Sequence, residues 1–211
     1  MNLHLTEAIV PYEIAARWRK DGGFSDSYAW HKRAWDCFPG QPEADRDFLT
    51  RLDDTGQGFR LLILSVTAPS QPDWCPDAGW RTKPVGESFL TRPAYRFSLL
   101  ANPTKKLAAP RDANGKRRGA KRIPISKRED LLAWLERKAS QHGFAIEPQE
   151  IRTIPQPRQP FLKGGKPGLH TATEFTGVLN VTDPALLREA FTRGIGSAKA
   201  FGFGMLCLSP A

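Results

Sequence analysis

The stretch Tyr95-Arg96-Phe97-Ser98-Leu99-Leu100-Ala101 is the clearest element of this sequence, and the fold can be worked out from it. Tyr95, Phe97 and Leu99 fall on one face, which is the period-2 pattern of a strand with one buried side. A helix is expected further along, because Ser126-Lys127-Arg128-Glu129 has the form of a capping box. Apolar residues recur along one face of that helix up to Gly143, namely Leu131, Leu132, Leu135 and Ala139.

Shorter apolar segments continue this half of the chain. We expect strands over Phe144–Ile154, Pro160–Leu162 and Gly168–Val181, a helix from Asp183-Pro184 to about Thr192, and a last strand over Phe203–Leu208. The order strand, helix, hairpin, helix, strand folds into an antiparallel sheet with helices on one face. RNA-recognition modules share this plan.

The first half of the chain repeats the beginning of this order. We expect a strand over Leu3–Val10, a helix after Pro11, a helix capped by Ser25 or Asp26 that runs to about Phe38, and hairpin strands over Asp47–Leu52 and Phe59–Val66. Leu61–Leu64 is a continuous apolar run, typical of a strand buried on both faces. Residues 69–93 are rich in Pro, Gly and Trp, and we expect a linker there with one short extra strand.

Length and composition fit a globular protein of one domain or two small ones, and the repeated element order favours an α+β protein with two similar domains. The chain has 211 residues, of which 40% are apolar and 25% charged, and we expect domains at residues 1–85 and 92–211. No apolar run could span a bilayer and the N-terminus has no secretory signal, so we expect no membrane partner. Cys37, Cys75 and Cys207 lack CxxC spacing, which argues against disulfides or structural zinc and favours a reducing cytoplasm.

Basic residues are concentrated in one segment of the chain. The 31 Lys and Arg exceed the 22 Asp and Glu by nine, and Lys105–Arg128 alone holds ten basic residues and one acid, Asp112. Such a concentration predicts a polyanionic partner, nucleic acid above all, although short basic runs can also be merely solvated loops. Asn114-Gly115 in its middle is a strong hairpin signal, so we expect a long β-arm.

Several motifs together resemble the CasE-type CRISPR-associated endoribonucleases over nearly the whole chain. They are Tyr28-Ala-Trp-His31, Tyr95–Lys105, Gly115-Lys-Arg117, Ala133-Trp-Leu135, Gly143-Phe144, Val181–Pro184 and the glycine-rich Gly194–Gly204 with Lys199 inside it. The resemblance implies tandem ferredoxin-like (RRM-like) domains. It also implies metal-independent cleavage of CRISPR repeat RNA to mature crRNA, which stays bound, with the other Cascade subunits as partners and no cofactor. Related enzymes often carry a hydroxyl residue just after the helical His, and here Asp36-Cys37-Phe38-Pro39 offers none.

An RNA strand can be cleaved by attack of a 2′-hydroxyl on the adjacent phosphorus, with loss of the 5′-oxygen. An enzyme for this reaction aligns these atoms, transfers two protons and stabilises the added negative charge. Histidine is the natural proton carrier near neutral pH, and the chain has four: His4, His31, His142 and His170. His31 has Tyr28 one helical turn before it, although a lone helical His is usually a surface or core residue. The resemblance matches His31 to the family's catalytic histidine and Tyr28 to its partner, which would bond the 2′-hydroxyl or a phosphate oxygen. Tyr28 could instead lie on the buried face with Trp30 and Trp35.

The remaining candidates are basic residues for RNA and glycines for close approach. The RNA-binding candidates are Lys32, Arg33, Lys105, Lys106, Lys116, Arg117, Arg118, Lys121, Arg122, Arg158, Lys163, Lys166 and Lys199. Gly194, Gly196, Gly202 and Gly204 form neither a Rossmann fingerprint nor a P-loop. They would either offer N–H groups to phosphates or pack the last helix against the sheet. No residue set has metal-ligand spacing, so we expect no metal site.

Two other functions fit the same residues. A non-catalytic subunit could bind RNA hairpins with this fold, in which case His31 would be incidental. A basic structural protein of a ribonucleoprotein would bind unrelated hairpins equally well.

Overall fold

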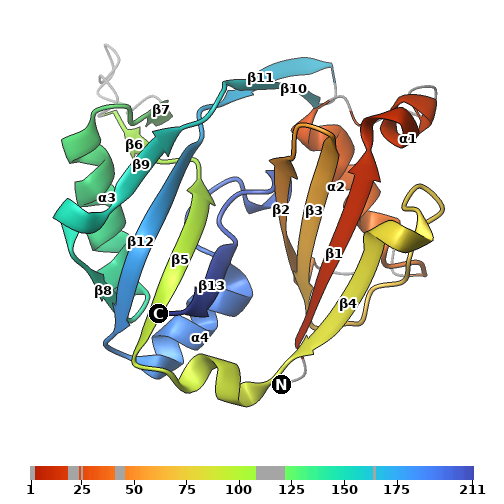
Figure 1. Cartoon of the computed structure of the whole chain (residues 1–211). Coiled ribbons are helices and arrows are strands. Elements are labelled where there is room, and N and C mark those ends of the chain that lie inside the picture. Colours follow the sequence, from red (N-terminus) through yellow and green to blue (C-terminus); the bar gives the residue numbers. More distant parts are fainter. Residues whose placement is uncertain (1–2, 19–23, 25, 41–45, 108–121, 164) are drawn as a thin grey trace, which may run out of the picture.

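The structure is a computed structural model that describes residues 3–18, 24, 26–40, 46–107, 122–163 and 165–211. Its two main antiparallel sheets stand side by side, one from each half of the chain, and a hairpin crosses above both (Figure 1). No helix among the described residues has both the length and the apolar composition needed to cross a bilayer.

The N-terminal sheet has the strand order β2-β3-β1-β4. Its strands are β1 Leu3–Pro11, β2 Phe48–Asp54, β3 Gly58–Ser65 and β4 Trp80–Val85. The predicted hairpin is therefore confirmed as β2-β3, and the extra strand expected in the linker is β4, which pairs with β1. Helices α1 Tyr12–Arg17 and α2 Ser27–Trp35 lie between β1 and β2, while only the 3₁₀ turn Asp77–Gly79 comes between β3 and β4.

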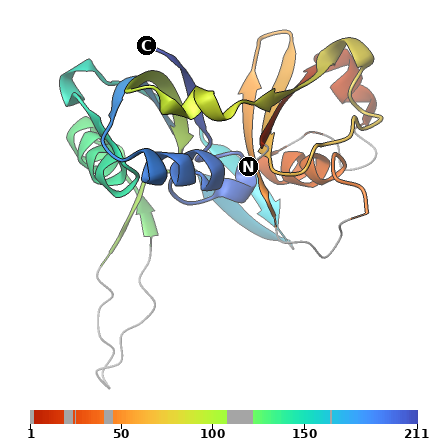
Figure 2. The same ribbon diagram turned by 90° about the horizontal axis from the view of Figure 1, so that it is seen from below.

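The C-terminal sheet repeats this strand order as β13-β5-β12-β8, with β9 also paired to β12. Its strands are β5 Ala94–Ala101, β8 Phe144–Ile146, β9 Arg152–Pro155, β12 Thr173–Val181 and β13 Leu206–Pro210. Helices α3 Arg128–Gln141 and α4 Pro184–Arg193 cover one face of it (Figure 2). The order in both sheets is that of the ferredoxin-like split βαβ fold, as predicted.

Three local predictions are wrong. The single strand expected over Phe144–Ile154 is divided into β8 and β9 by the 3₁₀ turn Pro148–Glu150, because proline cannot donate to a strand ladder. The strand expected over Gly168–Val181 is two strands, β11 Lys166–His170 and β12. The capping box at Ser126 does not form, since the first helical bond of α3 runs from Leu131 N–H to the Lys127 carbonyl at 2.9 Å.

Two short hairpins extend from the C-terminal half. Strands β6 Thr104–Lys106 and β7 Arg122–Pro124 pair at the base of the predicted basic arm. Residues 108–121 of that arm lie outside the described residues. Strands β10 Gln159–Lys163 and β11 pair around a tight turn and form the hairpin that reaches the N-terminal half in Figure 1.

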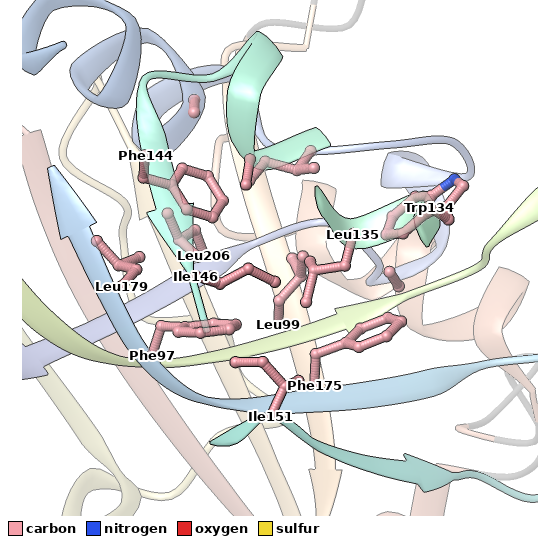
Figure 3. Packing of buried hydrophobic residues seen from close by; sticks show 14 of the residues in the cluster. Phe97, Leu99, Trp134, Leu135, Phe144, Ile146, Ile151, Phe175, Leu179 and Leu206 are labelled. Atoms are coloured by element: carbon pink, nitrogen blue, oxygen red, sulfur yellow. The ribbon is translucent and has the colours of Figure 1, made fainter. Parts of the chain in front are cut away.

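Each half has its own apolar core, and a third cluster joins them. The C-terminal core packs Leu135 and Trp134 of α3 onto Phe97, Leu99 and Phe175 of the sheet (Figure 3). The N-terminal core packs α2 against one face of β3, through Leu61 and Ile63 among others. The alternate residue Leu64 lies in a cluster with α4 and β13, which confirms that this strand is buried on both faces. The domain boundaries at residues 85 and 92 stay a prediction.

Candidate active site and nucleic-acid interface

Helix α2 begins at a side-chain cap. The Asp26 carboxylate accepts hydrogen bonds from the N–H groups of Tyr28 at 2.9 Å and Ala29 at 2.8 Å, which satisfies donors that the first helical turn leaves unpaired. Of the two caps that the sequence allowed, Asp26 is the one used. Trp30 and Ala34 are buried beneath the helix, so the helix presents its opposite side outward.

His31 lies on that outward side, within a group of aromatic rings. Its ring centroid is 6.2 Å from that of Tyr28, 6.2 Å from that of Phe201 and 6.5 Å from that of Trp35. Because Tyr28 is three residues earlier on the helix, the phenol and the imidazole occupy one face one turn apart. A phenol and an imidazole so arranged can bond and exchange protons with one bound substrate.

Tyr28 belongs to the His31 side of the helix and not to the core. Its ring is 6.3 Å from Phe201, and the Lys32 ammonium is 5.4 Å from the ring centroid. Trp30 is only 3% exposed and packs in the N-terminal core, whereas Tyr28 is half-buried. The alternative in which Tyr28 packs with Trp30 is therefore wrong.

Arg33, the other cation of this helix, is directed toward the protein. Its guanidinium lies 5.3 Å from the Trp18 ring and 5.6 Å from the Phe24 ring, and it forms a 3.3 Å ion pair with Asp36. Asp36 also accepts a 2.9 Å bond from the Trp74 indole N–H. These contacts fix the end of α2. Asp36, in the stretch where relatives often have a hydroxyl residue, thus binds Arg33 and Trp74.

The glycine-rich loop presents Phe201 to the catalytic candidates. All four glycines of the prediction have positive φ, and a Cβ on Gly204 would meet the Ile195 carbonyl. The Gly204 N–H donates to the Leu100 carbonyl at 2.7 Å and the Gly194 N–H to the Ala190 carbonyl at 2.8 Å. These contacts favour the packing role that the sequence left open for Gly194 and Gly204. Phe201, which the sequence reasoning missed, is an aromatic residue between glycines of this loop.

Lys199 of the same loop lies over the end of α4. Its ammonium donates to the Arg193 carbonyl at 2.8 Å, at the C-terminal end of the helix, where the helix dipole stabilises a positive charge. Burial lowers the pKa of Lys199, and the nearby Arg46 and Arg193 lower it further. Lys199 therefore caps the C-terminal end of α4. RNA binding by Lys199 stays a prediction.

The β10-β11 hairpin rests on α2 and on the glycine-rich loop. Phe161 covers Gly168 across the hairpin and stacks on His170 with centroids 4.4 Å apart, and Phe161 is 4.9 Å from Phe201. The Leu162 N–H also points to the Asp26 carboxylate at 3.4 Å. The backbone sets Lys163 and Lys166 opposite each other beside the turn.

His170 is enclosed by the same rings. It is 7% exposed, its Nδ1 is 3.2 Å from the Asn102 amide nitrogen, and it lies 4.7 Å from Phe201. Burial lowers the pKa of its imidazole. This arrangement suits a residue that packs the hairpin onto the loop rather than one that reaches substrate.

A cleft of about 280 Å³ lies beside His31, where the two halves of the chain meet. Arg158 and Gln159 border it from the hairpin, Ser27 from α2, and Gly202 from the loop. The sequence predicted His31 and Arg158 separately, and the fold brings them to the same cleft. A cation at this position can stabilise negative charge next to the imidazole.

A second hollow, of about 460 Å³, lies at the base of the basic arm, and we call it the basic groove. It is bordered by the predicted Lys105, Lys106 and Arg122 and also by Arg137 and Lys138 of α3. Gly196 lies in its wall together with Trp134. Arg137 and Lys138 were missed, although they follow Trp134 on α3 at the spacing of one helical turn. Lys116, Arg117, Arg118 and Lys121 lie outside the described residues.

Among the residues that the structure describes, no group of three or more His, Cys, Asp or Glu is arranged to hold a metal ion.

The whole chain is similar to known CRISPR-associated proteins. A model of the family of CRISPR associated proteins matches residues 3–210. The chain is 32% identical over 205 residues to the CRISPR system Cascade subunit CasE of Escherichia coli, with 93% of this chain and 96% of that protein covered. It is 27% identical over 201 residues to the CRISPR-associated endoribonuclease Cse3 of Thermus thermophilus, with 88% and 91% covered.

A solved structure shares the fold over the full length of both chains. It is Thermus thermophilus Cse3 bound to an RNA representing a pre-cleavage complex, with a TM-score of 0.73, 26% identity and 100% of each chain covered.

Proposed function

This chain is a CasE-type member of the family of CRISPR associated proteins, and we propose that it is an endoribonuclease that cuts CRISPR repeat RNA into mature crRNA. It keeps its product and works as a subunit of a Cascade complex in the cytoplasm. One observation carries the proposal: His31 and Tyr28 share the outward face of α2, beside a cleft that Arg158 borders.

In the proposed reaction the nucleophile is the 2′-hydroxyl of the RNA. His31 moves a proton between the reacting oxygens, and Tyr28 donates a hydrogen bond to the 2′-hydroxyl or a phosphate oxygen. Arg158 stabilises the charge that gathers on phosphorus. Attack by the 2′-oxygen expels the 5′-oxygen, so the products end in a 2′,3′-cyclic phosphate and a 5′-hydroxyl. The protein's own groups supply each step, which makes the reaction independent of added metal.

The basic arm and the basic groove hold the RNA stem. Their cations would run along the phosphate backbone, which is how proteins hold double-stranded RNA with little dependence on sequence. Lys163 and Lys166 at the hairpin turn would lie toward the scissile phosphate, as in the family that the chain resembles.

A single incubation tests the proposal against the non-catalytic alternative. Pure protein is mixed with labelled repeat RNA and with a scrambled hairpin, both in EDTA. We expect one cut in the repeat RNA and none in the scrambled hairpin. Binding of the repeat without any cut would instead identify an RNA-binding subunit, and equal binding of both hairpins a structural protein.

A further inference from the structure

The cleft beside His31 has walls that suit a flat aromatic ligand. Its sides come from the helix, the N-terminal sheet, the hairpin and the glycine-rich loop, and we call it the base cleft. Six of its residues matter here, namely Ser27, Trp30, Leu52, Phe59, Gln159 and Phe201. Phe59 and Phe201 are rings on which a planar group can stack, and Leu52 is half-buried in the wall.

Two buried polar atoms of these walls have no partner in the described part of the chain. They are the Ser27 hydroxyl oxygen and the Trp30 indole nitrogen, and their residues are 9% and 3% exposed. Leaving buried polar groups unpaired is costly, so such groups commonly mark a place where a ligand or water completes the bonding. An indole N–H seeks an acceptor, and a hydroxyl takes either a donor or an acceptor.

The size of the base cleft limits what it can take. Its volume of about 280 Å³ is just below the range of roughly 300–1,000 Å³ that is usual for drug-sized ligands. A single planar ring system lies well within this volume. A nucleobase has the required shape, with two faces for stacking and an edge of donors and acceptors.

We propose that the base cleft binds one unstacked nucleobase of the RNA, from a nucleotide that flanks the phosphodiester bond cut beside His31. The inference rests on the proposed function, since that function brings the scissile phosphate to His31 and Arg158 at the edge of the cleft. Holding the base would fix the adjoining ribose and phosphate, which aligns the attacking oxygen.

Binding of a non-cleavable repeat RNA, with deoxyribose before the cut, tests this inference. The base of each flanking nucleotide is removed in turn, and Kd is measured. At one of the two positions we expect affinity to fall by roughly 5- to 100-fold, the usual worth of a stacked base. Removing a base two nucleotides away should leave Kd unchanged.

Two variants connect the loss to the base cleft. Leu52→Phe, which fills the base cleft, should weaken binding of intact RNA by a similar factor. In this variant, removal of the base should cause no additional loss of affinity. Leu62→Phe is the matched control, because Leu62 is a half-buried leucine on the neighbouring strand β3 that lines a different hollow. It should keep the full sensitivity to base removal. Ser27→Ala should show a smaller loss, only with intact RNA, and carries the test if Leu52→Phe does not fold.

Three results would overturn the inference. If both flanking bases can be removed without effect while the wild-type protein still cuts repeat RNA, the base cleft is not used and the proposed function stands. If Leu52→Phe and base removal each weaken binding by their full factor when they are combined, the base binds elsewhere. If the wild-type protein cuts no repeat RNA, the proposed function and this inference fail together.

Discussion

Arg51 of β2 and Glu174 of β12 form an ion pair at 2.7 Å that joins the N-terminal sheet to the C-terminal sheet. Arg51 also donates to Ser98 of β5 and to Asp53 at 2.8 Å, and its side chain is only 8% exposed. Such a buried, multiply bonded guanidinium fixes the angle between the halves. That angle in turn positions α2 of the N-terminal half next to the β10-β11 hairpin and the glycine-rich loop of the C-terminal half.

Glu174→Ala should lower the free energy of unfolding by about 1–3 kcal/mol, because the buried Arg51 loses a bonded carboxylate. Asp130→Asn is the control, since its 3.2 Å pair with Lys105 is about half-exposed on both sides and such pairs are worth roughly 0–1 kcal/mol. Urea unfolding measures both. If both variants lower the free energy of unfolding by the same small amount, the Arg51–Glu174 pair does not hold the two halves of the chain together.

Stability should also depend on pH through Glu174. Burial by itself would raise the pKa of this carboxyl, but the hydrogen bonds from Arg51 and Ser98 lower it below the ordinary value of 4.5. A lowered pKa adds stability that is complete above about pH 4.5 and is lost as the pH falls through the folded-state value. Thermal unfolding of the wild type should therefore show a drop below pH 4.5 that Glu174→Gln reduces. An unchanged pH profile in the variant would contradict this.

His31→Ala should slow cleavage by roughly 10²- to 10⁴-fold, the usual contribution of a positioned acid–base group. Affinity for the repeat should change little, because His31 does not border the basic groove. Single-turnover rates and Kd for the same RNA separate the two effects. His4→Ala, on β1 of the same half, should cut at the wild-type rate. Wild-type cleavage by His31→Ala would reject the assignment.

A deoxyribose at the nucleotide before the cut should block cleavage and permit binding, because the 2′-hydroxyl is the proposed nucleophile. The upstream fragment of normal RNA should end in a 2′,3′-cyclic phosphate or its opened form, and the downstream fragment in a 5′-hydroxyl. Mass spectrometry of the fragments made in EDTA identifies these ends. A 5′-phosphate would indicate attack by water.

Neutralising Arg117, Arg118, Lys121 and Arg122 together should weaken binding of the repeat strongly. The slope of log affinity against log salt should flatten by roughly 0.7–0.9 for each phosphate that the variant no longer binds. Cleavage at saturating protein should persist, because the variant leaves Tyr28 and His31 unchanged. Loss of the preference for repeat over scrambled hairpin would show that the arm also reads the stem.

A two-charge control, matched to neutralisation of Arg137 and Lys138, is available on the other half of the chain. Arg81 and Lys83 are exposed on β4, and their neutralisation should leave affinity and salt slope unchanged. Neutralising Arg137 and Lys138 should act like the arm variant, since both border the basic groove. If the arm variant keeps wild-type affinity and slope, the RNA does not bind on that side of the protein.

Several local elements followed from the sequence because their deciding contacts are only a few residues apart. The Asp26 cap, the start of α4 at Asp183-Pro184, the β2-β3 hairpin and the alternation along β5 all belong to this class. Of the predictions that were wrong, the break between β8 and β9 has a local cause in Pro148, whereas the start of α3 depends on how the chain enters the helix. Ser126 has the right spacing for a capping box, but the chain enters α3 from β7, and the helix begins beyond it.

By itself, the sequence determined the ferredoxin-like order of the main elements, the concentration of basic residues in Lys105–Arg128 and the spacing that sets Tyr28 and His31 on one helical face. Only the tertiary structure decided what surrounds them. Phe201 meets His31 across 170 positions of sequence, and Arg158 reaches the same cleft through the hairpin. Local periodicity carries no information on such contacts, because they depend on how two separately patterned sheets pack and on the buried Arg51–Glu174 pair between them.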